Sequence, residues 1–397
     1  MRMEQAKEYE ELYWQWLCSC PLLTRHEIMA LIGHFGGVRE IYEAPVSELE
    51  YFGRSGKKWV DSLSSYKRTC SLEQNSKLLR DKNIIFCCFR NPIFPERLKR
   101  LPDCPYGLFY KGNLPSPEIV SVAVVGTRRC SNYGSRMASY IGCQLAQRHV
   151  QVISGMAGGV DGIAQRACLQ EGGHSYAVLG CGTDICYPPE NFKLYDNLAE
   201  HGGILSEYAP STPPLSENFP IRNRLIAGLA DAVVVVEAKK RSGSLITADL
   251  ALDQGKEVYA VPGRFGDERS LGCNRLIEEG ANVLTSVDQL LENIAASSGI
   301  ILPGQIHTAA DVIDAQKKRI DAEEKKLLLN KQIAADEMMS EPEKRIFRAV
   351  CSDSKSFDQL MEETCLSMTD LMKGLLSLQM KKYILEVSRN RYIKAGI

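Results

Sequence analysis

The feature that most constrains the fold is a series of short, continuously apolar runs between about residues 115 and 295. Segments with helical spacing of apolar residues, such as 135–148 and 162–171, separate them. The apolar runs are 119–125, 150–154, 175–179, 204–208, 232–236, 257–261 and 282–284. Apolar strands that alternate with helices are typical of a parallel sheet covered on both faces. The sequence therefore predicts an α/β fold with a Rossmann-like, mostly parallel sheet in a domain of residues 91–295.

The first 90 residues have a different pattern and are predicted to form a helical domain. The glycine-rich stretch 33–37 separates two short helices, and a second stretch of this kind lies at 52–58. A helix, a glycine hairpin and a helix form the plan of helix-hairpin-helix or SAM-like modules. The backbone amides of such hairpins can hold DNA phosphates without reading bases. A purely structural helical cap is an equal alternative.

The C-terminal part of the chain is predicted to contain a charged linker, 296–338, followed by a winged-helix domain, 339–397. The second prediction rests on three amphipathic helices and a hairpin formed by 384–387 and 391–393. The third helix, 367–382, would enter a DNA groove in such a domain, but it carries Asp370 and only scattered lysines. DNA binding and protein contact are therefore equal alternatives for this domain.

Composition restricts the classes of function. The 397 residues carry a formal net charge of −1, so an affinity for nucleic acid must come from local clusters of cations. No apolar run is long enough to span a membrane and no targeting signal opens the chain, which predicts a soluble cytoplasmic protein. The 14 cysteines include no C-x-x-C pair and the six histidines form no metal-binding motif, so we expect reduced thiols, no metal and no cofactor.

The loops at the carboxyl ends of the predicted strands share glycines, hydroxyls and cations. Ligands of open parallel sheets bind at this edge, where glycine lets the backbone approach a phosphate and arginine offers a forked donor. Several such loops on one edge predict an anionic ligand. The candidate binding residues are Arg128, Ser154, Gly155, Phe219, Arg222, Arg224, Lys239 and Lys240.

An extended polyanion fits these separate loops better than a compact nucleotide does. The chain has neither the G-x-G-x-x-G fingerprint of dinucleotide binding nor a G-x-x-x-x-G-K-[ST] loop. Phe219 could stack on a single-stranded base or pack in the core, and both interpretations are open. Arg222 and Arg224 lie on one predicted helix but point in different directions, so only one is expected to reach a phosphate while the other makes a structural contact.

Seven segments carry a resemblance to a known family. They are VAVVGTRRCSNYG (122–134), SGMAGGVDGIAQRA (154–167), VLGCGTDICYPPEN (178–191), GGILSEYAP (202–210), NFPIRNRLIAGLADAVVVVEA (218–238), SGSLITADLALDQGKEVYAVPG (242–263) and SLGCNRLIEEGANVL (270–284). In this order they resemble the DNA-processing protein A (DprA/Smf) family of bacteria.

This resemblance implies a non-enzymatic, single-stranded DNA-binding protein of natural transformation. Such a protein protects incoming DNA and loads a RecA-type recombinase onto it, displacing single-strand-binding protein. The resemblance also implies a homodimer built through the α/β domain. It places the DNA pocket at Arg128, the Ser154–Gly155 backbone, Phe219, Arg222 and Arg224.

Two enzymatic alternatives are weaker. The stretch Glu237-Ala238-Lys239 imitates the E-x-K end of a metal-dependent nuclease core, whose second carboxylate would have to be Asp231 or Asp161. A nucleotide-hydrolysing Rossmann enzyme shares the fold plan, but the nearest match to its P-G-G-x-G-T-x-x-E motif is Pro262-Gly263-Arg264, which lacks the glutamate.

Overall fold

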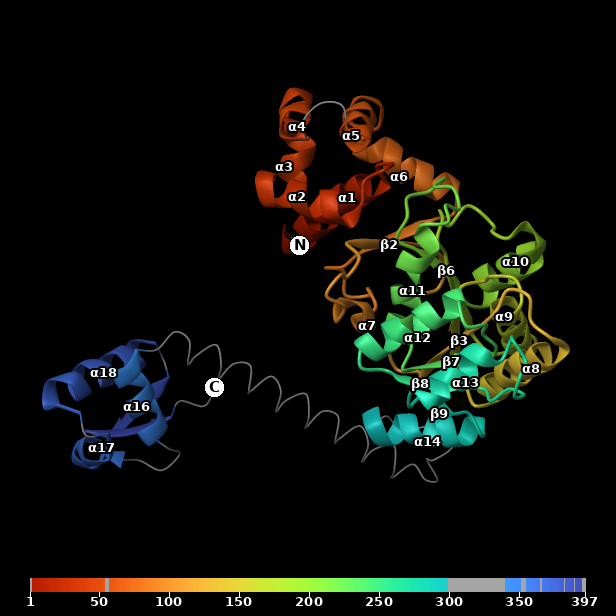
Figure 1. The fold of residues 1–397 in the computed structure, drawn as a ribbon. Helices are drawn as coiled ribbons and strands as arrows, with labels where there is room; N and C mark the ends of the chain where they lie inside the picture. The colour runs from red at the N-terminus through yellow and green to blue at the C-terminus, as the bar shows by residue number, and fades with distance from the viewer. Residues whose placement is uncertain are drawn as a thin grey trace. The chain divides into compact units, whose positions relative to one another are not determined.

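The computed structural model describes residues 2–53, 57–298, 340–350, 355–364, 366–381, 383–388 and 390–394. It divides into two compact units, Met1–Gln305 and Ile306–Ile397 (Figure 1). Apart from residues 296–298, the predicted charged linker lies outside the described residues. Within the described ranges, no helix combines the length and the apolar character needed to cross a lipid bilayer.

A nine-stranded sheet forms the centre of the larger unit, in the order β1-β2-β6-β5-β4-β3-β7-β8-β9. The strands from β3 to β9 are mutually parallel, and β2 and β1 extend one edge in antiparallel pairing. The strands are β1 (Ile85–Cys88), β2 (Gly107–Gly112), β3 (Ser121–Val125), β4 (Gln151–Ser154), β5 (Ser175–Val178), β6 (Gly203–Ser206), β7 (Ala232–Val235), β8 (Glu257–Ala260) and β9 (Asn282–Val283). The predicted mostly parallel α/β sheet is confirmed, and each predicted apolar run overlaps a strand.

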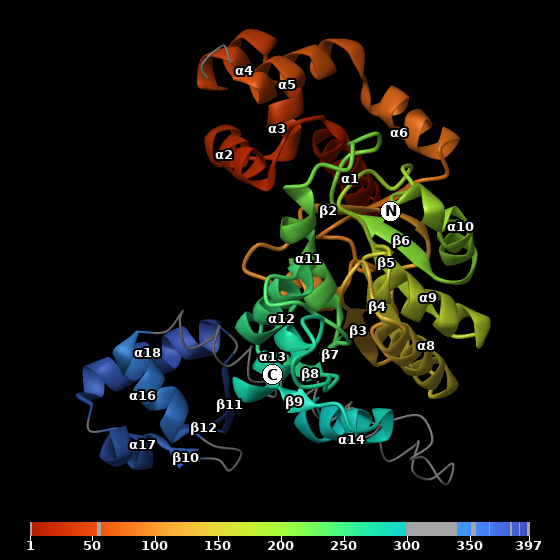
Figure 2. The ribbon, with the colours of Figure 1, turned by 45° about the vertical axis from the view of Figure 1, so that its right-hand side comes forward.

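Helices cover both faces of this sheet, and Figure 2 shows α11 and α12 on one side of the strands and α8 and α9 on the other. Val122 and Val124 pack toward α8 and α9, whereas Ala123 and Val125 pack toward α11 and α12. One face carries α8 (Asn132–Gln147), α9 (Val160–Gln170), α10 (Phe192–His201) and α14 (Val287–Ser298); the other carries α7 (Glu96–Lys99), α11 (Asn218–Leu229), α12 (Gly243–Asp253) and α13 (Leu271–Glu278). Because both faces are covered, the central strands are apolar on both sides, and this produced their continuous runs in the sequence.

The order of the strands reverses between β3 and β7. From β3 the chain moves outward through β4 and β5 to β6, and it then returns to place β7 on the opposite side of β3. The connections that leave the carboxyl ends of β3 and β7 therefore diverge to opposite faces of the sheet. In open α/β sheets the crevice at such a switch point is where ligands bind.

Six helices precede the sheet: α1 (Arg2–Ser19), α2 (Arg25–Phe35), α3 (Val38–Glu43), α4 (Val46–Gly53), α5 (Lys58–Thr69) and α6 (Leu72–Asp81). They enclose an aromatic-rich core that includes Trp14 and Trp16. The predicted hairpin at 33–37 is a tight turn between α2 and α3 in which Gly36 takes a left-handed conformation, with φ of +90°. The second predicted hairpin, 52–58, includes residues outside the described ones. A DNA-binding role for either turn stays a prediction.

The smaller unit contains α16 (Glu341–Ala349), α17 (Phe357–Thr364) and α18 (Met368–Met380), together with the strands β10 (Lys355–Ser356), β11 (Ile384–Ser388) and β12 (Arg391–Lys394). The strands pair in the order β10-β12-β11, so the predicted hairpin is joined by a short third strand. The solvent-facing side of α18 carries Met368, Met372 and Leu376, each more than half exposed. This apolar face favours protein contact over DNA binding for α18, and the winged-helix assignment stays a prediction.

Glu343 on α16 supports a pH-dependence prediction. Its carboxylate accepts hydrogen bonds from the Ser340 backbone N–H, at 2.7 Å, and from the Lys381 ammonium, at 2.8 Å. Burial raises the pKa of Glu343, but these hydrogen bonds and that of Ser377 outweigh it and lower the pKa to about 2. Because the pKa is lower in the folded state, the carboxylate stabilises the unit above its ordinary pKa of 4.5, and this stabilisation is lost as the pH falls toward 2.

We therefore expect the opening free energy of α16, measured by hydrogen exchange, to fall as the pH decreases from 4.5 toward 2. Glu343→Gln should have a lower opening free energy than the unmodified chain already at pH 6, with a weaker dependence on pH. Glu341→Gln is the control, because Glu341 is exposed on the same helix. Equal protection of α16 in all three proteins at pH 6 would contradict the prediction.

Candidate functional site

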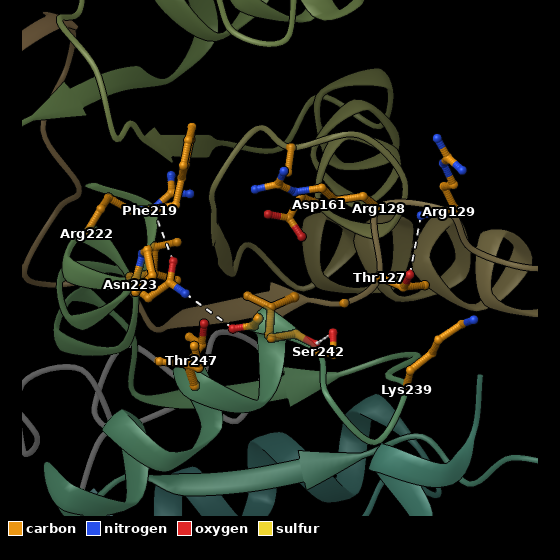
Figure 3. A pocket seen from close by; sticks show the side chains of 18 of the residues that line it. Thr127, Arg128, Arg129, Asp161, Phe219, Arg222, Asn223, Lys239, Ser242 and Thr247 are labelled. Atoms are coloured by element: carbon orange, nitrogen blue, oxygen red, sulfur yellow. Dashed lines mark hydrogen bonds between the residues drawn. The ribbon is translucent and has the colours of Figure 1, made fainter. Parts of the chain in front are cut away.

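A cavity of about 800 Å³ opens at the carboxyl ends of β3 and β7, where the strand order reverses (Figure 3). Its walls come from parts of the chain that are far apart in sequence. They include the loop 126–129 after β3, Asp161 at the start of α9, the amino-terminal half of α11, the basic stretch after β7 with the start of α12, and Arg269 before α13. The cavity therefore lies where the topology predicts a ligand site.

The walls of this cavity are strongly cationic. One carboxylate, that of Asp161, lines it together with six cationic residues. The six are Arg128, Arg129, Arg222, Lys239, Arg241 and Arg269. The chain as a whole is nearly neutral, so this is a local concentration of positive charge of the kind that attracts a polyanion.

Phe219, in the first turn of α11, lines the cavity beside two of these cations. The guanidinium carbon of Arg128 lies 5.3 Å from the ring centroid of Phe219, and that of Arg222 lies 5.7 Å from it. The Tyr187 ring is 5.5 Å away, centroid to centroid. Phe219 is half-buried and belongs to none of the hydrophobic clusters formed by the described residues. Of the two interpretations of this residue, core packing is thus the less favoured.

Arg222 is the buried cation of the site. Its side chain donates hydrogen bonds to the carbonyl oxygens of Val178 and Gly155, which lie at the carboxyl ends of β5 and β4. Burial lowers the pKa of Arg222 to about 10, and the nearby Asp161 carboxylate opposes this shift. The guanidinium therefore stays charged at neutral pH, and it contributes its positive charge to the cavity from behind Phe219.

Asp161, at the start of α9, balances this buried cation. Burial raises the pKa of Asp161, whereas Arg222 and the hydrogen bond from the Gly155 backbone N–H, at 3.2 Å, lower it. A side chain at position 155 would meet the Arg222 guanidinium, because a Cβ built there lies 2.8 Å from Nη2. Gly155 is therefore required by the packing of Arg222.

The structure corrects the predicted roles of Ser154 and Gly155. The Ser154 hydroxyl is fully buried and donates to the Val124 carbonyl oxygen at 2.7 Å, which joins β4 to β3. The Gly155 N–H is bonded to Asp161 and its carbonyl oxygen accepts from Arg222. Neither residue lines the cavity. Gly155 supports Arg222, and the donors of both residues are used within the fold.

The structure also separates the two arginines of α11. Arg222 lines the cavity, whereas Arg224 lies outside it and forms ion pairs with Glu207 and, at 2.9 Å, with Asp103. Arg224 therefore does not share the cavity with Arg222, and its contacts are structural, as expected for one of the two arginines. A DNA contact by Arg224 stays a prediction. Of the two lysines, Lys239 lines the cavity and Lys240 is exposed outside its lining.

Two of the lining cations, Arg241 and Arg269, were not among the predicted site residues. Arg241 directly follows Lys239 and Lys240, which were predicted site residues, so the basic run 239–241 could have indicated it. Arg269 lies among acidic residues in the loop before α13, and only the fold brings it to the cavity.

Figure 3 shows Arg128 extending toward Phe219 and Arg129 pointing away from it, so the two neighbours line different parts of the cavity rim.

The geometry does not support the nuclease alternative. Glu237 is buried at the carboxyl end of β7, where it accepts hydrogen bonds from the Ser131 N–H and hydroxyl, both at 3.0 Å. Asp231 precedes the amino end of the same strand and pairs with Arg97 at 2.8 Å. Among the described residues, no group of three or more histidine, cysteine or acidic side chains is placed to hold a metal ion. Glu237 instead fixes the loop that carries Arg128.

Comparisons with known proteins agree with the resemblance seen in the sequence. The family model of DNA recombination-mediator protein A matches residues 85–295. Protein Smf of Synechocystis sp. is 32% identical over 96% of this chain and 98% of its own length. DNA processing protein DprA of Streptococcus pneumoniae is 44% identical over 50% of this chain and 70% of its own length. The crystal structure of DNA processing protein A from Streptococcus pneumoniae covers 71% of this chain and 97% of that one, with 35% identity and a TM-score of 0.60.

The different surroundings of Arg224 and Arg128 predict different effects on stability. Arg224→Ala removes the cation that pairs with Glu207, whose side chain is mostly buried. We expect this substitution to lower the free energy of unfolding by about 3 kcal/mol, because it leaves an unpaired buried charge. Arg128 is exposed, so Arg128→Ala should change the same quantity by less than about 0.5 kcal/mol. Urea unfolding of both variants measures the difference, and equal midpoints for both would refute it.

Proposed function

Because the chain belongs to the family of DNA recombination-mediator protein A, we propose that it binds single-stranded DNA in the cavity at the carboxyl edge of its sheet. One observation carries the proposal: six cationic residues and a half-buried phenylalanine line a single cavity. Cations neutralise successive phosphates of a strand, and an aromatic ring accepts the face of any base. The combination therefore fits a nucleic acid strand bound with little preference for its sequence.

The shape of the site supports a single strand over a duplex. Cations reach the cavity from the loop after β3, from α11 and from the stretch after β7, so a ligand inside it is contacted on several sides. Phe219 lies within the walls and does not project from the surface. A base can reach such a ring only when it is unpaired and turned away from a partner strand. A duplex presents only its backbones and the edges of its bases to a protein.

We further propose that the protein works without catalysis. Glu237 and Asp231, two carboxylates of the nuclease alternative, stand at opposite ends of β7, and each is hydrogen-bonded within the fold. The third, Asp161, accepts a hydrogen bond from the Gly155 backbone N–H and balances the charge of Arg222. The name of the family, recombination-mediator protein, and that of its relative in Streptococcus pneumoniae, DNA processing protein, support a role in handing DNA to other proteins. On this basis we propose that the chain protects incoming DNA in natural transformation and loads a RecA-type recombinase in place of single-strand-binding protein. We propose that it does so as a homodimer in the cytoplasm.

Salt-dependent binding tests the proposed site. The unmodified chain should bind a fluorescent oligothymidine more tightly than a duplex of equal length, and it should leave both intact in the presence of Mg²⁺. The logarithm of its binding constant should fall with the logarithm of salt concentration by about 0.7 per phosphate contact. Arg128→Ala should reduce this slope by about one contact.

Lys240→Ala is the matched control for that measurement, because Lys240 is an exposed cation beside the cavity that does not line it. Its slope should equal that of the unmodified chain. Equal slopes for Arg128→Ala and the unmodified chain would remove Arg128 from the interface. Mg²⁺-dependent cleavage that disappears in Glu237→Ala would overturn the non-catalytic proposal.

Phe219 should contribute to binding through its ring and not through charge. Phe219→Ala should weaken oligothymidine binding by about 1–3 kcal/mol, because it removes both a stacking surface and the support for Arg128. The melting temperature should change little, since the ring is only half-buried and outside the core clusters. A variant that melts early and binds normally once folded would show that Phe219 is a core residue after all.

A further inference from the structure

The most exposed aromatic side chain of the described residues lies next to the cationic cavity, and neither the cavity nor the core uses it. Phe265 is about 100% exposed, as in an isolated residue (104%), whereas the other large apolar side chains of the sheet unit are partly covered. Burying a phenylalanine ring is favourable, so a ligand that covered this fully exposed ring would gain free energy of binding from it. Phe265 directly follows Pro262-Gly263-Arg264, the incomplete match to the motif of nucleotide-hydrolysing enzymes, for which the proposed function gives no role.

A hydrogen-bonded turn holds the ring outward. The Asp267 N–H donates to the Arg264 carbonyl oxygen at 3.2 Å, which makes Phe265 and Gly266 the central residues of a β-turn. Gly266 has φ of +83°, as the second central residue of a type II turn requires. The base of the loop is fixed by hydrogen bonds between Asn274 and the backbone of Gly263. Phe265 is therefore presented on an ordered turn.

The same loop forms part of the cavity wall. Arg269, four residues after Phe265, lines the cavity, and Glu268 lies 3.5 Å from Lys239, which also lines it. On the other side of the loop, the Tyr133 hydroxyl donates to the Pro262 carbonyl oxygen at 3.1 Å. Tyr133 is itself 40% exposed and directly follows the segment that carries Arg128 and Arg129. The turn is thus continuous with the cationic rim.

The acidic residues of this loop form no ion pair with its arginines. The Asp267 carboxylate accepts a hydrogen bond from the backbone N–H of Arg269, at 3.0 Å, and the Glu268 carboxylate faces Lys239. In the described part of the chain, neither Arg264 nor Arg269 forms an ion pair. The exposed ring of Phe265 is therefore flanked in sequence by two arginines that can approach phosphates. Aromatic rings placed between cations are the usual composition of a surface that follows a single strand.

We propose that Phe265 is a second base-stacking position, which contacts the single strand where it leaves the cavity over the turn 264–267. This inference rests on the proposed function and extends it, because it gives the bound strand a path and a minimum length. The contact requires a strand longer than the one that fills the cavity. A short oligonucleotide held by Arg128 and Phe219 would not reach the turn.

Oligonucleotide length provides the test. Binding of fluorescent oligothymidines of about 6 and about 25 nucleotides is measured by anisotropy for the full chain and for Phe265→Ala. We expect Phe265→Ala to bind the long strand about tenfold more weakly and the short strand with unchanged affinity. Phe192→Ala is the matched control, since Phe192 is an exposed phenylalanine on α10 that lines no part of the cavity, and it should bind both strands normally.

Phe265→Trp supplies a readout besides affinity. The native tryptophans Trp14, Trp16 and Trp59 all lie in the N-terminal helices, so an additional fluorescence change on binding reports the new indole. We expect the long strand to quench this signal and the short strand to leave it unchanged. Sedimentation of Phe265→Ala should show the same oligomeric state as the unmodified chain.

The possible outcomes are distinct. Loss of long-strand affinity with quenching at position 265 supports the proposal. Equal affinities of Phe265→Ala and the unmodified chain for the long strand overturn it, as does a shift in oligomeric state, which would make Phe265 a contact between copies of the chain. Arg128→Ala distinguishes a failure of this proposal from a failure of the proposed function. If Arg128→Ala weakens binding of both oligothymidines while Phe265→Ala weakens binding of neither, only the second stacking position is refuted. An unmodified chain that binds neither strand would instead refute the proposed function.

Discussion

The dehydrated guanidinium of Arg222 is the feature around which the candidate site is organised. A buried cation is unfavourable unless it is hydrogen-bonded and balanced, and here the carbonyl oxygens of Val178 and Gly155 and the nearby Asp161 meet both needs. These contacts tie α11 to the carboxyl ends of β4 and β5. They also set the position of Phe219 one turn earlier, whose ring in turn lies against Arg128. Three residues of the site thus depend on one buried charge.

The sheet could be predicted from the sequence because strands buried on both faces are apolar at successive positions, which gives a continuous apolar run at each central strand. It did not predict β2, which forms an antiparallel extension of the sheet from residues Gly107–Gly112. That strand depends on pairing with β6, nearly a hundred residues later, and local patterns contain no information about such a partner. Long-range pairing was the part of the fold that sequence patterns could not supply.

The candidate site was predicted in outline and missed in detail for a related reason. Glycine and arginine near strand ends indicated the edge of the sheet at which the cavity lies, but residue type does not show which way a side chain points. Arg222 and Arg224 are two residues apart on one helix, and one reaches the cavity while the other pairs with Glu207. The E-x-K resemblance at Glu237 failed similarly, because the linear motif was present while its carboxylate was already bonded to Ser131.

The reversal of strand order between β3 and β7 also has a consequence for the protein while it is being made. The residues that surround the cavity are spread from position 126 to position 269, and the strands β3 and β7 that bring them together are separated by more than a hundred residues. A ribosome must therefore release almost the whole sheet before the arginines converge. Until then the nascent chain carries these cations on separate segments, so the cavity cannot form before Arg269 has been synthesised.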